Sequence, residues 1–215
     1  MLTLCPSHLK ETPAEPANLV ISPCTPSLFG KLQRLFDSTG TLVTQYTKDL
    51  GDNRHRESFG RYFEDFEVGH IYEHRPGKTV TEADNHFFTL LTMNTHPMHF
   101  DVEYAKHTEF GKNLVVSPYT LALLIGMSVS DISQKAIANL GMDEVKFTAP
   151  VFAGDTIYGE SEVIAKRESK SRPGQGIVTV RTIGKNQRDE MICTFVRNVL
   201  VPARGQSADD RDPRY

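Results

Sequence analysis

The sequence lacks the features that would assign it to a membrane or to a disulfide-rich secreted class. It has no tryptophan and only three cysteines, Cys5, Cys24 and Cys193, which are widely spaced and form no Cys-x-x-Cys pair. An odd, scattered set of this kind predicts neither a disulfide framework nor a structural zinc site. No run approaches about 18 consecutive apolar residues, and no basic region followed by an apolar block opens the chain. We therefore expect a cytoplasmic protein.

A strong excess of one charge is also absent. The chain carries 24 basic and 27 acidic residues, a formal net charge of -3, so no whole-molecule field favours nucleic acid or an anionic membrane as a partner. What is present is 39% hydrophobic and 24% charged residues in a chain of 215. These proportions are typical of a soluble globular protein, and the length fits one domain with extensions.

The two ends of the chain differ in composition from its middle. Five of the twelve prolines lie in the first 26 residues, where they prevent a sustained helix and remove donors from any sheet. A short amphipathic helix is expected over 28–36, and the polar run 49–58 is typical of a linker. The sequence thus predicts three regions: a partly disordered N-terminal extension over 1–59, a domain over 60–203, and a disordered tail over 204–215.

A first helix is predicted to follow an extended segment that ends at Val80. Thr81 is a suitable N-cap for it. Its inward face is expected to consist of the large apolar residues that follow: Phe87, Phe88, Leu90 and Leu91. Pro97 cannot continue the helix, because it lacks an N–H and disfavours helical geometry at His96. We therefore predict an irregular turn over 93–100.

A second, central helix is predicted to begin near Ser117. Ser117 is a good N-cap, and Pro118 suits the first helical position. The early turns are apolar almost all round, which is typical of a buried helix. The small residues Ala122, Gly126 and Ser130 recur every four positions, and we expect them to let the backbone of a sheet come close.

Segments of alternating and β-branched residues after Gly141 predict four strands, around 145–151, 156–164, 177–180 and 192–201. The joints between the last three are rich in turn residues and predict antiparallel hairpins. One buried helix followed by four strands indicates an α+β domain, in which an antiparallel sheet is wrapped around the central helix.

The segment 93–101, MNTHPMHFD, places Asn94, His96 and His99 around a proline-fixed turn. Histidine titrates near neutral pH and can act as a base there. Asn94 cannot take up a proton, so it can only orient water or substrate by hydrogen bonds. His99 would then act alone with water, or a nearby carboxylate such as Asp84 or Asp101 would substitute.

This segment resembles the MaoC-like (R)-specific enoyl-CoA hydratases and dehydratases, which have the hot dog fold. The resemblance covers about 60–203, and two other stretches carry it: GRYFEDFEVGHIYEHR from Gly60 and FTAPVFAGDTIYGESEV from Phe147. The family motif reads G-D-x-N-P-hydrophobic-H. Laid on this chain, it places the family's Asp at Asn94, its Asn at His96 and its His at His99.

The resemblance implies a single hot dog domain that acts as an acyl-CoA hydratase or dehydratase, a hydro-lyase. In the family the Asp and the His activate water, so Asn94 and His99 are the implied catalytic positions. A backbone N–H at the start of the central helix polarises the thioester carbonyl, which here corresponds to Ser117. We expect Ser117 and His96 to bind substrate. The resemblance implies no metal or redox cofactor, because CoA is part of the substrate.

The substrate hypothesis rests on charge. With Asn94 in place of a carboxylate and with His96 added, the pocket is less negative than in the family, which favours an acyl group that bears its own carboxylate. Branched dicarboxylyl-CoA esters such as mesaconyl- or itaconyl-CoA fit this description, and hydratases of that kind are similar to this sequence. Arg75 or Lys78 would then pair with the distal carboxylate.

Other interpretations stay open at this point. A hot dog acyl-CoA thioesterase would direct water at the carbonyl carbon, and a non-catalytic acyl-CoA-binding or partner subunit is made credible by the missing Asp. Asn94 is also an ordinary turn residue, His99 can be a buried histidine satisfied by backbone, and His96 with His99 can be read as a metal-binding pair. Active sites of the family lie where two hot dog domains meet, so we expect at least a homodimer.

Overall fold

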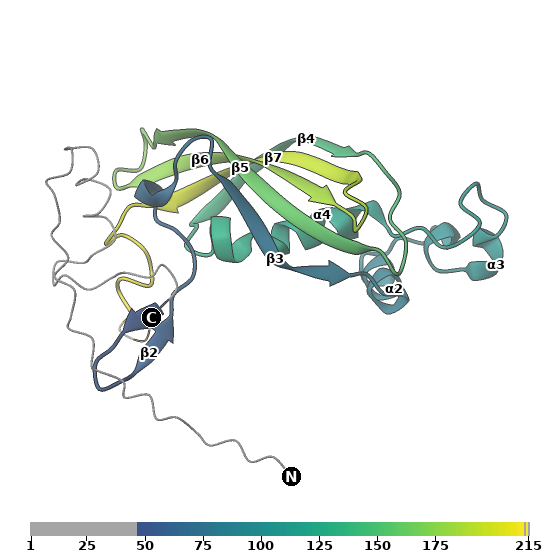
Figure 1. The fold of residues 1–215 in the computed structure, drawn as a ribbon. Coiled ribbons are helices and arrows are strands. Elements are labelled where there is room, and N and C mark those ends of the chain that lie inside the picture. Colours follow the sequence, from purple (N-terminus) through teal and green to yellow (C-terminus); the bar gives the residue numbers. More distant parts are fainter. Residues whose placement is uncertain (1–46, 213, 215) are drawn as a thin grey trace, which may run out of the picture.

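A curved antiparallel sheet wraps around helix α4 (Ser117–Met127), as Figure 1 shows. The computed structural model describes residues 47–212 and 214, so the short helix expected over 28–36 lies outside the described residues. The sheet has five strands in the order β3-β5-β6-β7-β4, and all neighbouring pairs are antiparallel. The predicted α+β architecture, with a sheet around a central helix, is thereby confirmed.

The four strands predicted after the helix are present, and the extended segment predicted to end at Val80 forms an edge strand before it. They are β3 (Ile71–Thr79), β4 (Ala138–Phe147), β5 (Thr156–Glu168), β6 (Gln175–Lys185) and β7 (Met191–Pro202). Strand β4 begins three residues before Gly141, where the strands were expected to start. Buried residues alternate along β6 and β5, which places one face of each strand against the core.

The run 49–58 is not a linker, because it contributes to a small hairpin. Strands β1 (Thr47–Asp49) and β2 (His55–Glu57) pair in antiparallel register. The chain reverses at Gly51, Asp52 and Asn53, all of which have positive φ. Glycine, aspartate and asparagine are the residues that tolerate this conformation, so the polar run encodes a turn.

The tail expected over 204–215 is also ordered over much of its length. Ser207 is buried, and the Tyr62 hydroxyl donates to Asp210 over 2.7 Å. Lys135 forms an ion pair with Asp209, and Arg204 forms one with Asp65. These contacts fasten the C-terminal residues to the 3-10 turn η1 (Phe63–Asp65) and to the segment after α4. Composition alone predicted a solvated tail because none of these partners is near in sequence.

Helix α2 (Glu82–Leu91) begins as predicted but turns the opposite face inward. Thr81 is its N-cap and forms a capping box with Asp84. The predicted inward face is wrong for three of its four residues, since Phe87, Leu90 and Leu91 are 71%, 58% and 68% exposed. Phe88 is half-buried and meets the Tyr119 ring edge to face. The buried residues are the polar pair Asn85 and Thr89. Both find hydrogen-bond partners inside the molecule, which makes their burial tolerable.

Helix α4 differs from the prediction at its cap and in its packing. The N-cap is Val116, Ser117 is the first helical residue, and no side chain caps this end. The expectation of all-round burial is wrong, because only Thr120 and Leu124 are buried. The stripe of Ala122, Gly126 and Ser130 lies on the exposed side.

The close approach of helix and sheet is made by Leu124 against glycines of the sheet. A Cβ added at Gly184 would lie 2.5 Å from Leu124 Cδ1, whereas one added at Gly126 would meet nothing within 4 Å. We expect Gly184→Ala to lower the free energy of unfolding by about 1–3 kcal/mol through overpacking. Gly126→Ala should raise it by about 0.5–1 kcal/mol, because alanine is the better helix former. Urea denaturation of both variants checks the opposite signs, and equal effects would contradict this packing.

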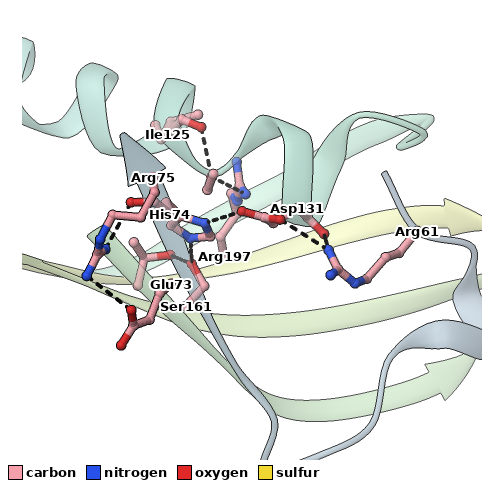
Figure 2. A network of polar contacts seen from close by, with 10 residues as sticks. Arg61, Glu73, His74, Arg75, Ile125, Asp131, Ser161 and Arg197 are labelled. Atoms are coloured by element: carbon pink, nitrogen blue, oxygen red, sulfur yellow. Dashed lines mark hydrogen bonds and ion pairs between the residues drawn. The ribbon is translucent and has the colours of Figure 1, made fainter. Parts of the chain in front are cut away.

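A buried polar network lies between the sheet and the segment after α4, as Figure 2 shows. His74 of β3 is fully buried; its Nδ1 lies 2.9 Å from Asp131 Oδ2, and its Nε2 lies 2.8 Å from Ser161 Oγ. The Arg61 guanidinium donates to the Asp131 backbone oxygen over 2.8 Å. The hydrogen bond from His74 holds the pKa of Asp131 below its usual value, and Arg61 adds to this effect.

Arg197 of β7 fastens the C-terminal end of α4. Its side chain is fully buried and donates from Nη2 to Ser128 Oγ over 2.9 Å, and that hydroxyl donates to the Ile125 carbonyl (Figure 2). Burial lowers the pKa of Arg197 to about 10. A cation at this end of a helix is favoured by the partial negative charge of the last carbonyl groups. The sheet and the network therefore hold one end of α4, while the other end remains available for a site.

We expect Asp131→Asn to lower the free energy of unfolding at pH 7 by about 2–4 kcal/mol, because it removes one partner from a largely buried network of charges. Since the pKa of Asp131 is lower in the folded state, its ionisation stabilises the protein above about pH 4 and this contribution is lost as the pH falls. The variant should therefore lose less stability than wild type between pH 5 and pH 3. Urea denaturation across this range checks it, with the exposed turn variant Asp189→Asn as the control. Parallel pH curves for wild type and Asp131→Asn would contradict the assignment.

Candidate active site

His99 is held in one orientation by a backbone carbonyl. It lies at the end of the 3-10 turn η2 (Pro97–His99) and is 8% exposed. Its Nδ1 lies 2.8 Å from the Leu114 carbonyl oxygen, which can only accept, so Nδ1 carries the proton. Nε2 of the neutral ring is then an acceptor, and no described residue occupies it. A histidine fixed in this way can take up a proton from a bound molecule.

The turn before His99 is fastened by its own side chains. Asn94 Oδ1 accepts the His96 backbone N–H over 3.0 Å, and His96 Nδ1 accepts the Met98 N–H over 3.2 Å. Met93 has a φ of 58°, which ends α2 and turns the chain. The irregular turn predicted over 93–100 is thus present. The Asn94 amide nitrogen and the His96 Nε2 remain free of described partners.

The structure brings the predicted residues of this segment together. The rings of His96 and His99 meet edge to face with their centroids 5.8 Å apart, and the His96 ring also contacts Tyr104 of helix α3 (Val102–Ala105) at 6.0 Å. His99 is buried while His96 is exposed. His99 is therefore shielded on one side by the ring of His96.

Asn85 is a residue that sequence reasoning missed. It projects from α2, is 2% exposed, and donates from Nδ2 to the His99 carbonyl over 2.8 Å and to the Leu114 carbonyl over 3.2 Å. Its Oδ1 accepts the Val116 N–H over 2.9 Å. One side chain thus connects α2, the histidine turn and the start of α4. The only signal in the sequence was an asparagine within a predicted helix. The large apolar residues of that helix predicted that a different face is buried.

Ser117 lies at the first turn of α4, at the edge of an apolar cavity of about 240 Å³. The cavity is lined mainly by apolar residues from four segments: Phe110, Leu114, Val115, Phe147, Ala149, Pro150, Val151 and Ile192, together with Ser117, Thr120 and Thr148. Pro118 has no N–H and the Tyr119 N–H bonds to the Val116 carbonyl, whereas the Ser117 N–H has no partner among the described residues. Such a free N–H at a helix N-terminus favours negative charge.

The other predicted charged groups already have structural partners. Asp84 belongs to the capping box of α2 and lies 2.9 Å from Lys78 Nζ. Asp101 caps α3 by accepting the Tyr104 N–H. Arg75 pairs with Glu73 over 3.1 Å. Asp84 and Asp101 thus serve as helix caps, a role for which aspartate is well suited. His99 is left as the group best placed to move a proton.

Within residues 47–212 and 214, no group of three or more histidine, cysteine, aspartate or glutamate side chains is arranged to hold a metal ion. None of the helices in this part of the chain has the length and apolar content needed to cross a bilayer.

Comparison with known proteins gives one family and a group of relatives. The sequence profile of the family described as mesaconyl-CoA hydratase matches residues 41–213, a range that extends beyond 60–203 at both ends. The mesaconyl-CoA hydratase of Cereibacter sphaeroides is 36% identical over 149 residues, which is 69% of this chain and 43% of that protein. The chain spans less than half the length of the curated relatives of this kind that it matches.

Solved structures identify the fold. The chain is similar to a MaoC-like dehydratase from Rhodospirillum rubrum, with a TM-score of 0.61, 30% identity, and coverage of 67% of this chain and 99% of that one. A Mycobacterium tuberculosis protein described as having a double hot dog fold gives a TM-score of 0.63 at 23% identity, with coverage of 69% and 47%. At that identity the second likeness shows the fold alone. The predicted hot dog fold is confirmed.

Proposed function

Because the chain belongs to the mesaconyl-CoA hydratase family, we propose that it is a hydro-lyase that adds or removes water across the double bond of a 2-enoyl-CoA thioester. One observation carries the proposal: the Leu114 carbonyl fixes the proton of His99 on Nδ1 and leaves Nε2 as an acceptor. Leu114 also lines the apolar cavity that ends at the first turn of α4. Ser117 and Leu114, the residue that holds the His99 ring, therefore both line a space with the character of an acyl site.

The proposed reaction needs only groups of this chain and water. Water attacks Cβ of the enoyl thioester while Nε2 of His99 takes one of its protons, and the electrons of the double bond move onto the carbonyl oxygen. The Ser117 N–H and the positive end of α4 stabilise the resulting enolate. Collapse of the enolate takes the proton from His99 onto Cα, which restores the thioester and the neutral histidine.

Asn94 and His96 have supporting roles in this proposal. The free Nδ2 of Asn94 orients water or substrate by donating a hydrogen bond, since the amide cannot take up a proton. The exposed His96 contacts the acyl group. With Asn94 at the position of the motif's Asp, the turn carries no carboxylate at that position. No metal or redox cofactor is needed, because CoA enters as part of the substrate.

We propose a branched dicarboxylyl-CoA ester, with mesaconyl-CoA as the first candidate. The relatives with mesaconyl-CoA in their names support this choice, and so does the neutral Asn94. Arg75 and Lys78, which were expected to pair with the distal carboxylate, already pair with Glu73 and Asp84. We therefore assign binding of the substrate carboxylate to His96. The neutral Asn94 contributes by removing the repulsion that a carboxylate at this position would exert.

The loss of enoyl-thioester absorbance with crotonyl-, mesaconyl- and itaconyl-CoA tests the function, with a free-thiol assay run alongside. Turnover without thiol release supports the hydro-lyase. Release of free CoA thiol would show a thioesterase, and tight binding without turnover would show an acyl-CoA-binding or partner subunit. Equal rates for crotonyl-CoA and a dicarboxylyl-CoA would contradict the substrate choice while leaving the reaction in place.

The assembly we propose is a homodimer, in which a second copy supplies the second hot dog domain. Three observations support it: the relatives are more than twice as long as the matched region, strand β4 lies at an open edge of the sheet, and α2 exposes a cluster of apolar residues at helical spacing. Open edges and exposed apolar patches are typical of interfaces. We place this dimer in the cytoplasm, where the cysteines stay reduced.

We expect the double variant Phe87→Glu with Leu91→Glu to be monomeric, because both residues project from the exposed face of α2. Light scattering after size exclusion gives the mass directly. Val68→Glu, at a similarly exposed residue before β3, should remain dimeric. A monomeric wild type, or a double variant that keeps the mass of two copies, would rule out this interface.

A further inference from the structure

Asn85 uses every hydrogen-bonding group of its side chain. Nδ2 donates both of its protons, to the carbonyl oxygens of His99 and Leu114, at 2.8 and 3.2 Å. Oδ1 accepts from the Val116 N–H at 2.9 Å and from the Thr89 hydroxyl at 3.4 Å. The residue is 2% exposed. A buried amide with four contacts on three different segments has a single orientation available to it.

Two of these bonds hold His99. One ends on the backbone oxygen of His99 itself, and the other ends on the Leu114 oxygen, which also accepts the proton of the His99 ring over 2.8 Å. The carbonyl that fixes the ring is therefore itself fixed by Asn85. Both the position of the His99 backbone and the direction of its ring depend on the same amide group.

The third bond holds the start of α4. Val116 is the N-cap of this helix, and its N–H is occupied by Asn85 Oδ1. Ser117 follows directly, so the direction of its free N–H is set by the peptide plane next to the one that Asn85 holds. The amide thus lies between the proton acceptor of the site and its backbone donor.

We propose that Asn85 is a positioning residue that sets the His99 ring and the Ser117 N–H at the separation needed by an enoyl thioester. The inference rests on the proposed function for the identity of the reaction, but the geometry it invokes is independent of the substrate. Small misplacements of reacting groups lower turnover by about 100-fold. Asn85 touches neither substrate nor water in this proposal and acts only through its two neighbours.

The chemistry of the amide explains why other residues of similar shape cannot replace it. Aspartate keeps the acceptor for the Val116 N–H but cannot donate to two carbonyl oxygens when ionised, and it would place its charge beside them. Leucine has nearly the same volume and offers no hydrogen bond. Asn85→Asp therefore loses the hydrogen bonds to the His99 and Leu114 carbonyls but keeps the one from the Val116 N–H. Asn85→Leu loses all of them.

A matched control exists in the buried network around His74. Thr182 is fully buried and bonds through its hydroxyl to Ser161 over 2.8 Å. Thr182→Val, like Asn85→Leu, replaces a buried polar side chain by an apolar one of similar shape. The Thr182 hydroxyl contacts neither His99, Asn85 nor the first turn of α4, so Thr182→Val lowers stability and separates loss of fold from loss of positioning.

The experiment combines steady-state kinetics on mesaconyl-CoA with nitrogen-15 NMR of labelled histidine, in which His99→Gln identifies the His99 signals. For wild type we expect His99 to show a protonated Nδ1 and an unprotonated Nε2. Asn85→Asp and Asn85→Leu should each lower kcat by about 100-fold, with KM changed less than threefold, and should give His99 mixed or broadened signals. Thr182→Val should leave kcat and the His99 signals as in wild type.

The outcomes separate the two proposals. A wild type without turnover on any enoyl ester overturns the function, and the NMR signals still decide the role of Asn85. Asn85 variants that keep the wild-type His99 signals and kcat overturn the positioning role, whatever their stability. An Asn85→Asp variant with full kcat also overturns it, because donation to His99 and Leu114 would then be unnecessary.

Discussion

His99→Ala is expected to lower kcat/KM for the hydration of mesaconyl-CoA by about 10³-fold, within the range that general acid–base catalysis contributes. The variant removes the acceptor that takes the proton of water and returns it to Cα. No other described side chain is placed to substitute, since Asp84 and Asp101 cap helices. The same absorbance assay that tests the function measures this loss.

The fold of His99→Ala should survive. The Leu114 oxygen keeps the Asn85 amide as a donor, so no buried carbonyl is left unpaired, and the cost in free energy of unfolding should be about 1–3 kcal/mol. His107→Ala changes an exposed histidine of the same region and should keep full activity. Retention of activity within threefold in His99→Ala would exclude His99 as the base.

Ser117→Pro is expected to lower kcat by about 10²–10³-fold, the loss seen when one donor to a developing oxyanion is removed. Proline deletes the N–H while suiting the first position of a helix. Val116, with φ -64° and ψ 126°, already has the extended conformation required of a residue before proline. The change therefore removes the N–H, together with the serine hydroxyl, with little change to the backbone.

The control for this variant is at the same residue. Ser117→Ala keeps the N–H and removes only the hydroxyl, so it should stay within about threefold of wild type if the backbone donor carries the effect. An equal loss of activity in Ser117→Ala and Ser117→Pro would assign the role to the hydroxyl, which both variants lack. Circular dichroism of both variants shows whether α4 is intact.

Local patterns predicted the strands and the helix starts. The alternation of apolar residues along β6 and the N-cap at Thr81 each depend on residues within a few positions of one another. Both are present in the structure. The inward face of α2 was mistaken for a different reason. An apolar residue such as Phe87 signals contact with some apolar surface, and the pattern does not say whether that surface belongs to the same chain.

The site was predictable only in part. The motif at 93–101 placed Asn94, His96 and His99 in one turn, because they are neighbours in sequence. Asn85 could not be found in this way, since its partners are backbone groups 14, 29 and 31 residues further on. His74 is similar, with partners 57 and 87 residues away. Hydrogen bonds to distant backbone leave no trace in residue spacing.

The two ends of α4 have separate roles, one in holding the helix and one in the candidate site. The C-terminal end is held by Arg197 through Ser128, and the N-terminal end carries Ser117. Eleven residues of helix separate them by about 16 Å, beyond the distance over which substitutions usually influence one another. Changes that raise thermal tolerance at one end, such as Gly126→Ala, should therefore combine additively with changes of substrate range at the other.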